Sequence, residues 1–136
     1  MSLKFHPEEG AIVICDFSGF KKPEMIKRRP VVVVSPRFRS RSGLCTIVPL
    51  STTKPLNRMP YHHVLHLDPP LPPPFDSVVN WVKADLLATV SFERLKMPFD
   101  GKDEEGRRRL VKRCVSTEDL DEIRECIKCV VGINRP

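Results

Sequence analysis

The chain has 136 residues, of which 40% are hydrophobic and 29% are charged, a composition typical of a soluble globular protein. One domain over residues 1–136 is predicted, because folded domains cluster near this length. No apolar run approaches the roughly 20 residues of a membrane-spanning helix, and the first ten residues lack the features of a secretion signal. We therefore expect a cytoplasmic protein with no membrane partner.

The charges are distributed unevenly along the chain. Lys and Arg outnumber Asp and Glu by 23 to 17, and residues 1–67 hold 11 basic but only 4 acidic side chains. This surplus favours an anionic partner, nucleic acid first, although a merely solvated basic surface is the alternative. The five cysteines are odd in number and lack the spacing of a disulfide framework, so we expect reduced thiols.

The first half of the chain is predicted to consist of strands. Short apolar segments rich in β-branched residues, bounded by Pro, Gly and polar residues, are typical of strands. Val31–Ser35 is apolar throughout its first four residues and suits a central strand buried on both faces. Pro30 should be its first residue, because proline has no N–H for the ladder. The predicted strands are Ala11–Phe17, Val31–Ser35, Leu44–Leu50 and Tyr61–Leu67.

Two further strands are predicted at Val78–Asp85 and Ala88–Ser91. A stiff proline-rich loop at 69–74 precedes them, and a turn-rich charged excursion at 97–106 follows. The two-residue period of a strand places alternate side chains of Val78–Asp85 on a common face. These side chains are Val79, Trp81, Lys83 and Asp85.

A single helix is predicted at the end of the chain, over about 117–131. Ser116 followed by Asp119 resembles a capping box, and Gly132 ends the helix. The apolar stripe is Leu120, Ile123, Ile127, Val130 and Val131. Because short strands with short connections pair as hairpins, we predict an α+β fold, mainly β: a small antiparallel barrel with a C-terminal α-helix.

The usual signatures of nucleotide, dinucleotide, serine-hydrolase and zincin sites are absent from the sequence, so no cofactor is predicted. Cys126 and Cys129 form C-x-x-C, but on a helix they point to the flank and back of the stripe, and no second pair completes a zinc shell. His62 and His66 face away from His63 in a strand, so no metal site is predicted either.

Two polar groups lie at predicted strand ends. Lys27, Arg28 and Arg29 precede the Val31–Ser35 strand, and Ser51-Thr52-Thr53 follows Leu44–Leu50. If these strands pair as a hairpin, Arg29 meets Ser51. A guanidinium beside a hydroxyl suits a phosphodiester, since its planar fork grips two phosphate oxygens. The alternative is an Arg bonded to a carbonyl beside a turn that satisfies its own backbone.

The chain resembles the PemK/MazF toxins of type II toxin–antitoxin systems over residues 8–95 and the terminal helix. The most specific blocks are RPVVVVSP and VPLSTT. The matching segments, in the family's order, are Gly10–Phe17, Pro23–Glu24, Arg28–Pro36, Ile47–Thr53, Trp81–Asp85, Thr89–Ser91 and Arg94–Leu95.

The resemblance implies an SH3-like barrel of the CcdB/PemK type, a homodimer, and sequence-specific, metal-independent cleavage of single-stranded mRNA that arrests growth. It also implies an acidic antitoxin whose disordered tail fills the RNA groove. Arg29 and Ser51 match the family's catalytic Arg and Thr, and Glu24 matches its loop Glu. Lys83 and Asp85 match an R-x-D pattern found in some members. Lys83 stands in place of the Arg, and its ammonium group cannot bind a phosphate in the bidentate way that a guanidinium does.

The implied mechanism is attack of the ribose 2′-OH on the adjacent phosphorus, giving a 2′,3′-cyclic phosphate and a 5′-OH. Arg29 would stabilise the phosphorane, Ser51 would orient the phosphate or relay a proton, and Glu24 or Asp85 would act as base. The expected RNA-binding residues are Lys27, Arg28, Arg37, Arg39, Thr52, Thr53 and Lys83. The alternative is a non-catalytic RNA binder or a CcdB-like topoisomerase inhibitor on the same scaffold.

Overall fold

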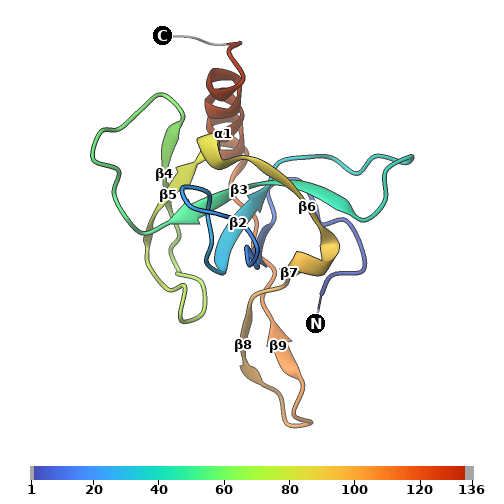
Figure 1. The fold of residues 1–136 in the computed structure, drawn as a ribbon. Coiled ribbons are helices and arrows are strands. Elements are labelled where there is room, and N and C mark those ends of the chain that lie inside the picture. Colours follow the sequence, from blue (N-terminus) through green and yellow to red (C-terminus); the bar gives the residue numbers. More distant parts are fainter. Residues whose placement is uncertain (1, 134–136) are drawn as a thin grey trace.

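The computed structural model describes residues 2–133, which form a seven-stranded antiparallel sheet, a separate two-stranded sheet and a C-terminal helix (Figure 1). The order in the larger sheet is β4-β5-β3-β2-β1-β7, and β6 also pairs with β3. The strands are β1 (Ile12–Cys15), β2 (Arg29–Val33), β3 (Leu44–Ser51), β4 (His62–His66), β5 (Val79–Lys83), β6 (Ala88–Ser91), β7 (Leu95–Lys96), β8 (Phe99–Lys102) and β9 (Arg108–Leu110). The predicted α+β, mainly β class is confirmed.

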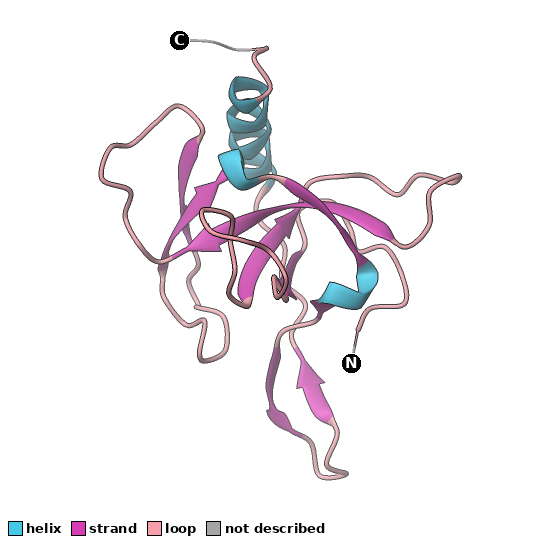
Figure 2. Ribbon diagram, in the orientation of Figure 1, coloured by secondary structure: helices cyan, strands magenta, loops and turns pink. Residues whose placement is uncertain are grey.

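The helix α1 (Thr117–Val130) and the β8–β9 hairpin project from opposite ends of the sheet (Figure 2). Two short 3₁₀ helices, η1 (Ala84–Leu86) and η2 (Phe92–Arg94), flank β6. No helix within residues 2–133 is long and apolar enough to cross a membrane.

Two apolar clusters cover the two faces of the central strands. The loop-side cluster packs beneath the loop between β1 and β2 and is formed by Leu3, Ala11, Val13, Cys15, Phe17, Val31, Val33, Cys45, Ile47, Val90 and Leu95. The helix-side cluster packs beneath α1 and is formed by Ile12, Val32, Val48, Leu50, Leu65, Leu67, Leu71, Val82, Ala84, Ile123 and Cys126. Alternate residues of β1, β2 and β3 enter different clusters, so these strands are buried on both faces as predicted for β2.

The predicted start and end of α1 are confirmed within one residue. Ser116 Oγ accepts a hydrogen bond from Asp119 N at 3.0 Å, and Gly132 adopts a φ of +83° just after the helix. Asp119 Oδ1 also lies 2.8 Å from Nε2 of His63 in β4, which ties the first helical turn to the sheet.

Two details of the predicted helix face are wrong. Val131 is 56% exposed, whereas Cys126 is 5% exposed and lies in the helix-side cluster. Ile123, which is fully buried, marks the centre of the contact face, and Cys126 lies only about 60° from it around the helix. The buried face of the helix is therefore centred on Ile123, and not on Leu120 as the predicted stripe implies.

Three predicted boundaries also require correction. β2 begins at Arg29, so Pro30 is its second residue, and pairing with β3 begins only at Val31, where an N–H is again available. β5 ends at Lys83 and the chain turns into η1, so Asp85 leaves the face shared by the preceding residues. The 97–106 excursion contains β8, which pairs with β9 as a hairpin.

All five cysteines are free thiols, and three of them lie in the two cores. Burial raises the pKa of Cys15 to about 12 and the pKa values of Cys45 and Cys126 to about 11. Cys114 is exposed, although partial burial and the carboxylate of Glu8 raise its pKa as well, and Cys129 is half-buried. Because the thiolate is the reactive form, the core thiols are inert near neutral pH.

We predict that a disulfide reagent at pH 8 modifies only Cys114 and Cys129 rapidly in the folded protein, whereas all five thiols react in denaturant. Reaction of the folded protein should accelerate as the pH rises, because the thiolate is the reactive form. Released chromophore gives the count, and peptide mapping identifies the modified residues. Rapid labelling of Cys15 in the folded protein would contradict this assignment.

Candidate active site

The pairing of β2 with β3 brings Arg29 and Ser51 together. The two strands are antiparallel with Val31 opposite Pro49, and the same register continued by two residues sets Arg29 opposite Ser51. Val31 and Ile47 enter the loop-side cluster, and side chains alternate along a strand, so Arg29 and Ser51 both lie on that face. Directly opposed residues have Cβ atoms about 4.5–5.5 Å apart. The strand-end juxtaposition expected from the sequence therefore follows from the observed register.

Ser51 is held in a defined orientation at the end of β3. The residue is 6% exposed, and its Oγ accepts a hydrogen bond from Thr53 N at 3.1 Å. The hydroxyl proton is thus left to be donated to a further acceptor. Thr52 and Thr53 are exposed immediately beside it.

Arg29 is half-buried, and its Nε is buried without a hydrogen-bond partner among residues 2–133. A buried guanidinium N–H with no acceptor is costly, because the group has lost water and gained nothing in exchange. The fork of an arginine matches the paired oxygens of a phosphate. Arg29 therefore carries a buried Nε–H without a partner among the described residues and a planar fork of the kind that binds anions.

On the other side of β3, β5 extends the same face. Trp81 lies opposite Ser51 and Lys83 lies opposite His62 of β4. Trp81 is only 8% exposed. The guanidinium of Arg58 lies 5.5 Å from the centroid of its ring and covers one face of the indole. Arg58 comes from a loop with no local pattern, and sequence reasoning missed it.

His62 is a second residue whose position sequence reasoning did not foresee. Its Nδ1 accepts a hydrogen bond from Met59 N at 3.0 Å, which leaves the proton of the neutral ring on Nε2. Burial, followed by the charges of Lys83 and Arg58, lowers the pKa of His62, while the carboxylate of Asp85 opposes that shift. The ring is therefore held neutral near pH 7, with Asp85 close enough to influence it.

The loop between β1 and β2 packs on the face that carries Arg29. Its residues Phe20 and Met25 contact the loop-side cluster. Glu24 is exposed on this loop and its Oε1 accepts a hydrogen bond from Lys21 N at 2.6 Å, leaving the other carboxylate oxygen unengaged by that bond. Lys27 and Arg28 are exposed at its end.

Arg94 fastens the beginning of this loop. Its Nη1 donates to the carbonyl oxygens of Asp16 at 2.9 Å and Ser18 at 2.7 Å, and its guanidinium lies 5.0 Å from the Phe20 ring centroid. Arg28 Nη2 lies 3.5 Å from Asp16 Oδ2 and adds an exposed ion pair. A hydrogen bond from Ser18 N, followed by Arg28, lowers the pKa of Asp16.

Arg37 and Arg39 do not reach this site. They lie on the β2–β3 loop at the opposite end of the hairpin, which extends away from β4 and β5 in Figure 1. With a rise of about 3.3 Å per residue, β2 alone separates its two ends by more than 10 Å. Within residues 2–133, no group of three or more His, Cys, Asp or Glu side chains could hold a metal ion.

Residues 8–131 match the family described as PemK-like, MazF-like toxin of type II toxin-antitoxin system. The chain belongs to this family. The uncharacterized protein YifN of Escherichia coli (strain K12) is 30% identical over 114 residues, covering 70% of this chain and 75% of YifN.

Two solved structures have the same fold as this chain at low sequence identity. MazF (Form-I) from Deinococcus radiodurans is 19% identical, with coverage of 95% of this chain and 99% of that one and a TM-score of 0.66. An endoribonuclease in complex with its cognate antitoxin from Mycobacterial species is 21% identical, with coverage of 96% and 99% and a TM-score of 0.62.

Because Arg94 holds two carbonyls of the β1–β2 loop, Arg94→Ala should loosen that loop while leaving the sheet intact. We expect hydrogen exchange to accelerate at residues 16–20 and to stay unchanged in β2 and β3. Arg94→Lys should restore little protection, since an ammonium cannot reproduce the planar fork. Equal exchange in the wild-type and Ala proteins would remove Arg94 from this role.

Proposed function

We propose that this protein is a growth-inhibiting toxin that acts as a sequence-specific endoribonuclease on single-stranded mRNA. Membership of the PemK/MazF family and the endoribonucleases among its structural neighbours support this class of activity. The single observation that carries the proposal is the β2–β3 register, which sets Arg29 opposite Ser51. A guanidinium beside a hydroxyl is suited to a phosphodiester, because the planar fork pairs with two phosphate oxygens and the hydroxyl adds a further donor.

In the proposed reaction the ribose 2′-OH loses its proton to a base, and its oxygen forms a bond to the adjacent phosphorus. The bond from phosphorus to the 5′ oxygen breaks, leaving a 2′,3′-cyclic phosphate, and the departing oxygen takes a proton to become a 5′-OH. Because the substrate supplies the nucleophile, the reaction as proposed needs no metal or cofactor.

Arg29 would bind the non-bridging oxygens and stabilise the charge that grows on them in the phosphorane. Ser51 would act as a hydrogen-bond donor to one of them, because its oxygen accepts from Thr53 N and its proton remains available for donation. The second lone pair of this oxygen also allows the hydroxyl to relay a proton, so both roles considered for it stay part of the proposal.

The remaining residues of the proposed site are either candidate bases or contacts to the RNA backbone. The candidate bases are Glu24, on the β1–β2 loop, and Asp85, in η1. Contacts to the RNA backbone are assigned to the exposed or half-buried side chains near them, Lys27, Arg28, Thr52, Thr53 and Lys83. Arg37 and Arg39 can contribute only to an RNA segment that follows the hairpin to its other end.

The proposed assembly is a cytoplasmic homodimer that an acidic antitoxin inhibits. The Mycobacterial endoribonuclease was solved with its cognate antitoxin, and the net charge of +6 of this chain favours an acidic partner. A basic groove that binds RNA also offers cations to the carboxylates of a disordered tail.

The proposed function is tested with purified protein, a mixed-sequence RNA and excess EDTA. We expect cleavage to persist with the chelator and a substrate with deoxyribose at the cut position to resist. Arg29→Ala should slow cleavage by about 100- to 1,000-fold, and Arg29→Lys should recover only part of that loss. Ser51→Thr should retain activity that Ser51→Ala loses, because the hydroxyl is kept.

Arg109→Ala is the matched control, since it removes an exposed guanidinium from β9, outside the proposed site. Binding of RNA without cleavage would identify a non-catalytic RNA binder. Full activity of Arg29→Ala, or cutting of the deoxyribose substrate at the all-ribose rate, would overturn the mechanism.

The general base is identified from the pH dependence of kcat/KM. On the acidic side, the rate should rise as the base loses its proton. Removing the true base, with either Glu24→Gln or Asp85→Asn, should abolish that rise and reduce the plateau by about 100-fold or more. The other substitution should keep the wild-type profile. Retention of the acidic limb by the double variant would exclude both carboxylates.

A further inference from the structure

A small polar hollow of about 330 Å³ lies at the edge of the sheet where β7 pairs with β1. In this pairing Lys96 lies directly opposite Ile14. Ile14 is two residues from Ile12, which enters the helix-side cluster, so Ile14 and Lys96 both face that side of the sheet. Arg29 and Ser51 lie on the other face, and neither lines the hollow. The hollow is therefore a site separate from the proposed nuclease centre.

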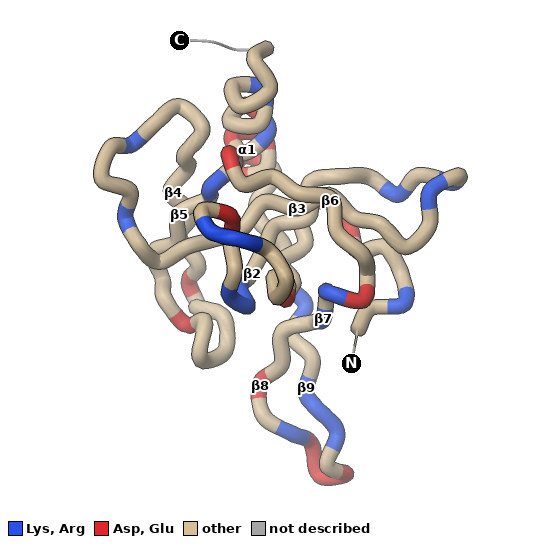
Figure 3. Tube along the Cα trace, viewed as in Figure 1, with Lys and Arg blue, Asp and Glu red and all other residues tan. Residues whose placement is uncertain are grey.

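The charges that surround the hollow do not balance. Four of its lining residues are basic and two are acidic, which leaves a formal charge of +2. The basic residues are Arg28, Arg94, Lys96 and Arg108, and the acidic residues are Asp16 and Glu93. Figure 3 shows the basic positions around β7 and along β9. An excess of positive charge in a concave surface favours an anionic ligand.

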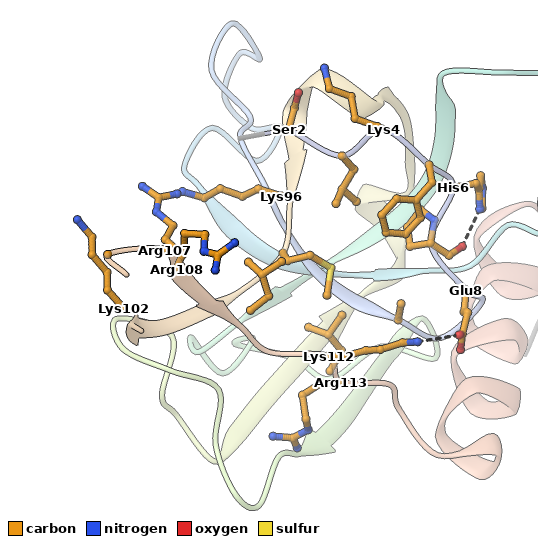
Figure 4. Close-up of a pocket in the computed structure, with 18 residues that line it drawn as sticks. Ser2, Lys4, His6, Glu8, Lys96, Lys102, Arg107, Arg108, Lys112 and Arg113 are labelled. Carbon is orange, nitrogen blue, oxygen red and sulfur yellow. Dashed lines mark hydrogen bonds and ion pairs between the residues drawn. The ribbon is translucent and has the colours of Figure 1, made fainter. Parts of the chain in front are cut away.

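An aromatic ring brings two of these cations together. The ammonium of Lys96 lies 5.7 Å, and the guanidinium of Arg108 lies 4.3 Å, from the ring centroid of Phe99 in β8. Figure 4 shows both side chains at the same end of a larger neighbouring cavity. Burial, followed by the charges of Arg28 and Arg108, lowers the pKa of Lys96, as expected where positive charges crowd together.

The two cations held by Phe99 have no carboxylate partner. Among residues 2–133, neither Lys96 nor Arg108 forms an ion pair. The carboxylate of Asp16 accepts a hydrogen bond from Ser18 N at 2.9 Å and lies 3.5 Å from Arg28, so it is already engaged. Neighbouring cations without a counter-ion repel each other, and an anion bound between them would remove that cost.

The size of the charge favours a phosphate dianion. A phosphate monoester carries a charge of about −1.5 to −2 near pH 7, whereas each phosphodiester of a nucleic acid carries a single negative charge. A dianion therefore matches the formal charge of +2 around the hollow. Arg28 and Arg108 offer planar guanidinium groups that pair with two phosphate oxygens, and Lys96 adds a compact ammonium.

An RNA strand fits the hollow less well. A strand bound at the proposed cleavage site would have to pass round the β1–β7 edge to reach it. Sequence-tolerant RNA binding also uses aromatic rings on which bases stack, and none of the nine described residues that line the hollow is aromatic. The ring of Phe99 beside it is already contacted by both cations. The hollow is thus suited to a compact anion.

We propose that this hollow binds a dianionic phosphate, as inorganic phosphate or as the monoester group of a small molecule. The phosphate oxygens would be shared among the four cations of the lining. Arg94 also holds the start of the β1–β2 loop through two backbone carbonyls, and Arg28 lies near the end of that loop. A bound phosphate would therefore connect both ends of the loop.

The test titrates the isotope-labelled full chain with inorganic phosphate at constant ionic strength and follows the amide signals by NMR. Every titration is repeated in the Arg29→Ala background, which removes binding at the proposed cleavage site. We expect saturable shifts at Ile14 and Lys96 in both proteins. Dimethyl phosphate, a diester with one negative charge, should bind at least about tenfold more weakly. Glycerol phosphate is titrated in parallel: tighter binding than inorganic phosphate supports the ester as ligand, and weaker binding supports the free ion.

Neutral variants locate the site. Lys96→Gln and Arg108→Gln should each weaken phosphate binding by at least about tenfold, because each removes a charged donor. Arg109→Gln is the matched control: it removes the same charge from the same strand but does not line the hollow, so its effect should be within about twofold. Lys96→Arg should retain most of the binding, since the charge is kept. Circular dichroism establishes that each variant is folded.

Hydrogen exchange tests the link to the β1–β2 loop. Saturating phosphate should slow exchange at residues 16–20 in the wild-type protein and leave it unchanged in Lys96→Gln. Equal exchange with and without phosphate in the wild type would overturn the contact with Arg94.

Three results would overturn the phosphate site itself. One is the absence of any saturable shift at millimolar phosphate, and another is an Arg109→Gln effect as large as that of Arg108→Gln. The third is loss of phosphate binding in the Arg29→Ala background, which would place the anion at the proposed cleavage site. Failure of the nuclease experiments leaves these measurements unchanged, since they use no substrate turnover.

Discussion

The arrangement of the candidate site depends on the pairing of β2 with β3, which both apolar clusters hold in place. Val31 and Val33 contact one cluster while Val32 contacts the other, so a slip of one residue would exchange the side chains that fill the two clusters along the whole strand. The penalty for that exchange fixes the register. Arg29 consequently faces Ser51 because apolar residues farther along the strands hold them in this register.

The rest of the site is assembled around this pair by contacts that are distant in sequence. Arg94 spans from η2 to the loop after β1, and Arg58 reaches across to Trp81. His63 joins β4 to the first turn of α1 through Asp119. Hydrogen-bonded and stacked side chains thus orient the loops, while the apolar clusters hold the strands.

The central strands, the helix and the hairpin that joins Arg29 to Ser51 could be predicted because local patterns specify them. β-branched runs give the strands, and Ser116 with Gly132 bounds the helix. The β8–β9 hairpin was missed because its residues are exposed on both sides and show no apolar alternation. Partners such as Arg58 and Trp81 carry no local signal, since they meet only once the chain has folded.

The β8–β9 hairpin forms no ladder with the seven-stranded sheet, and its residues enter neither apolar cluster. Substitutions in the hairpin therefore have little influence on whether the seven-stranded sheet forms. The length and charge of the hairpin can change almost independently of the residues around Arg29. Relatives built on this scaffold can therefore differ in this hairpin while they keep the residues around Arg29.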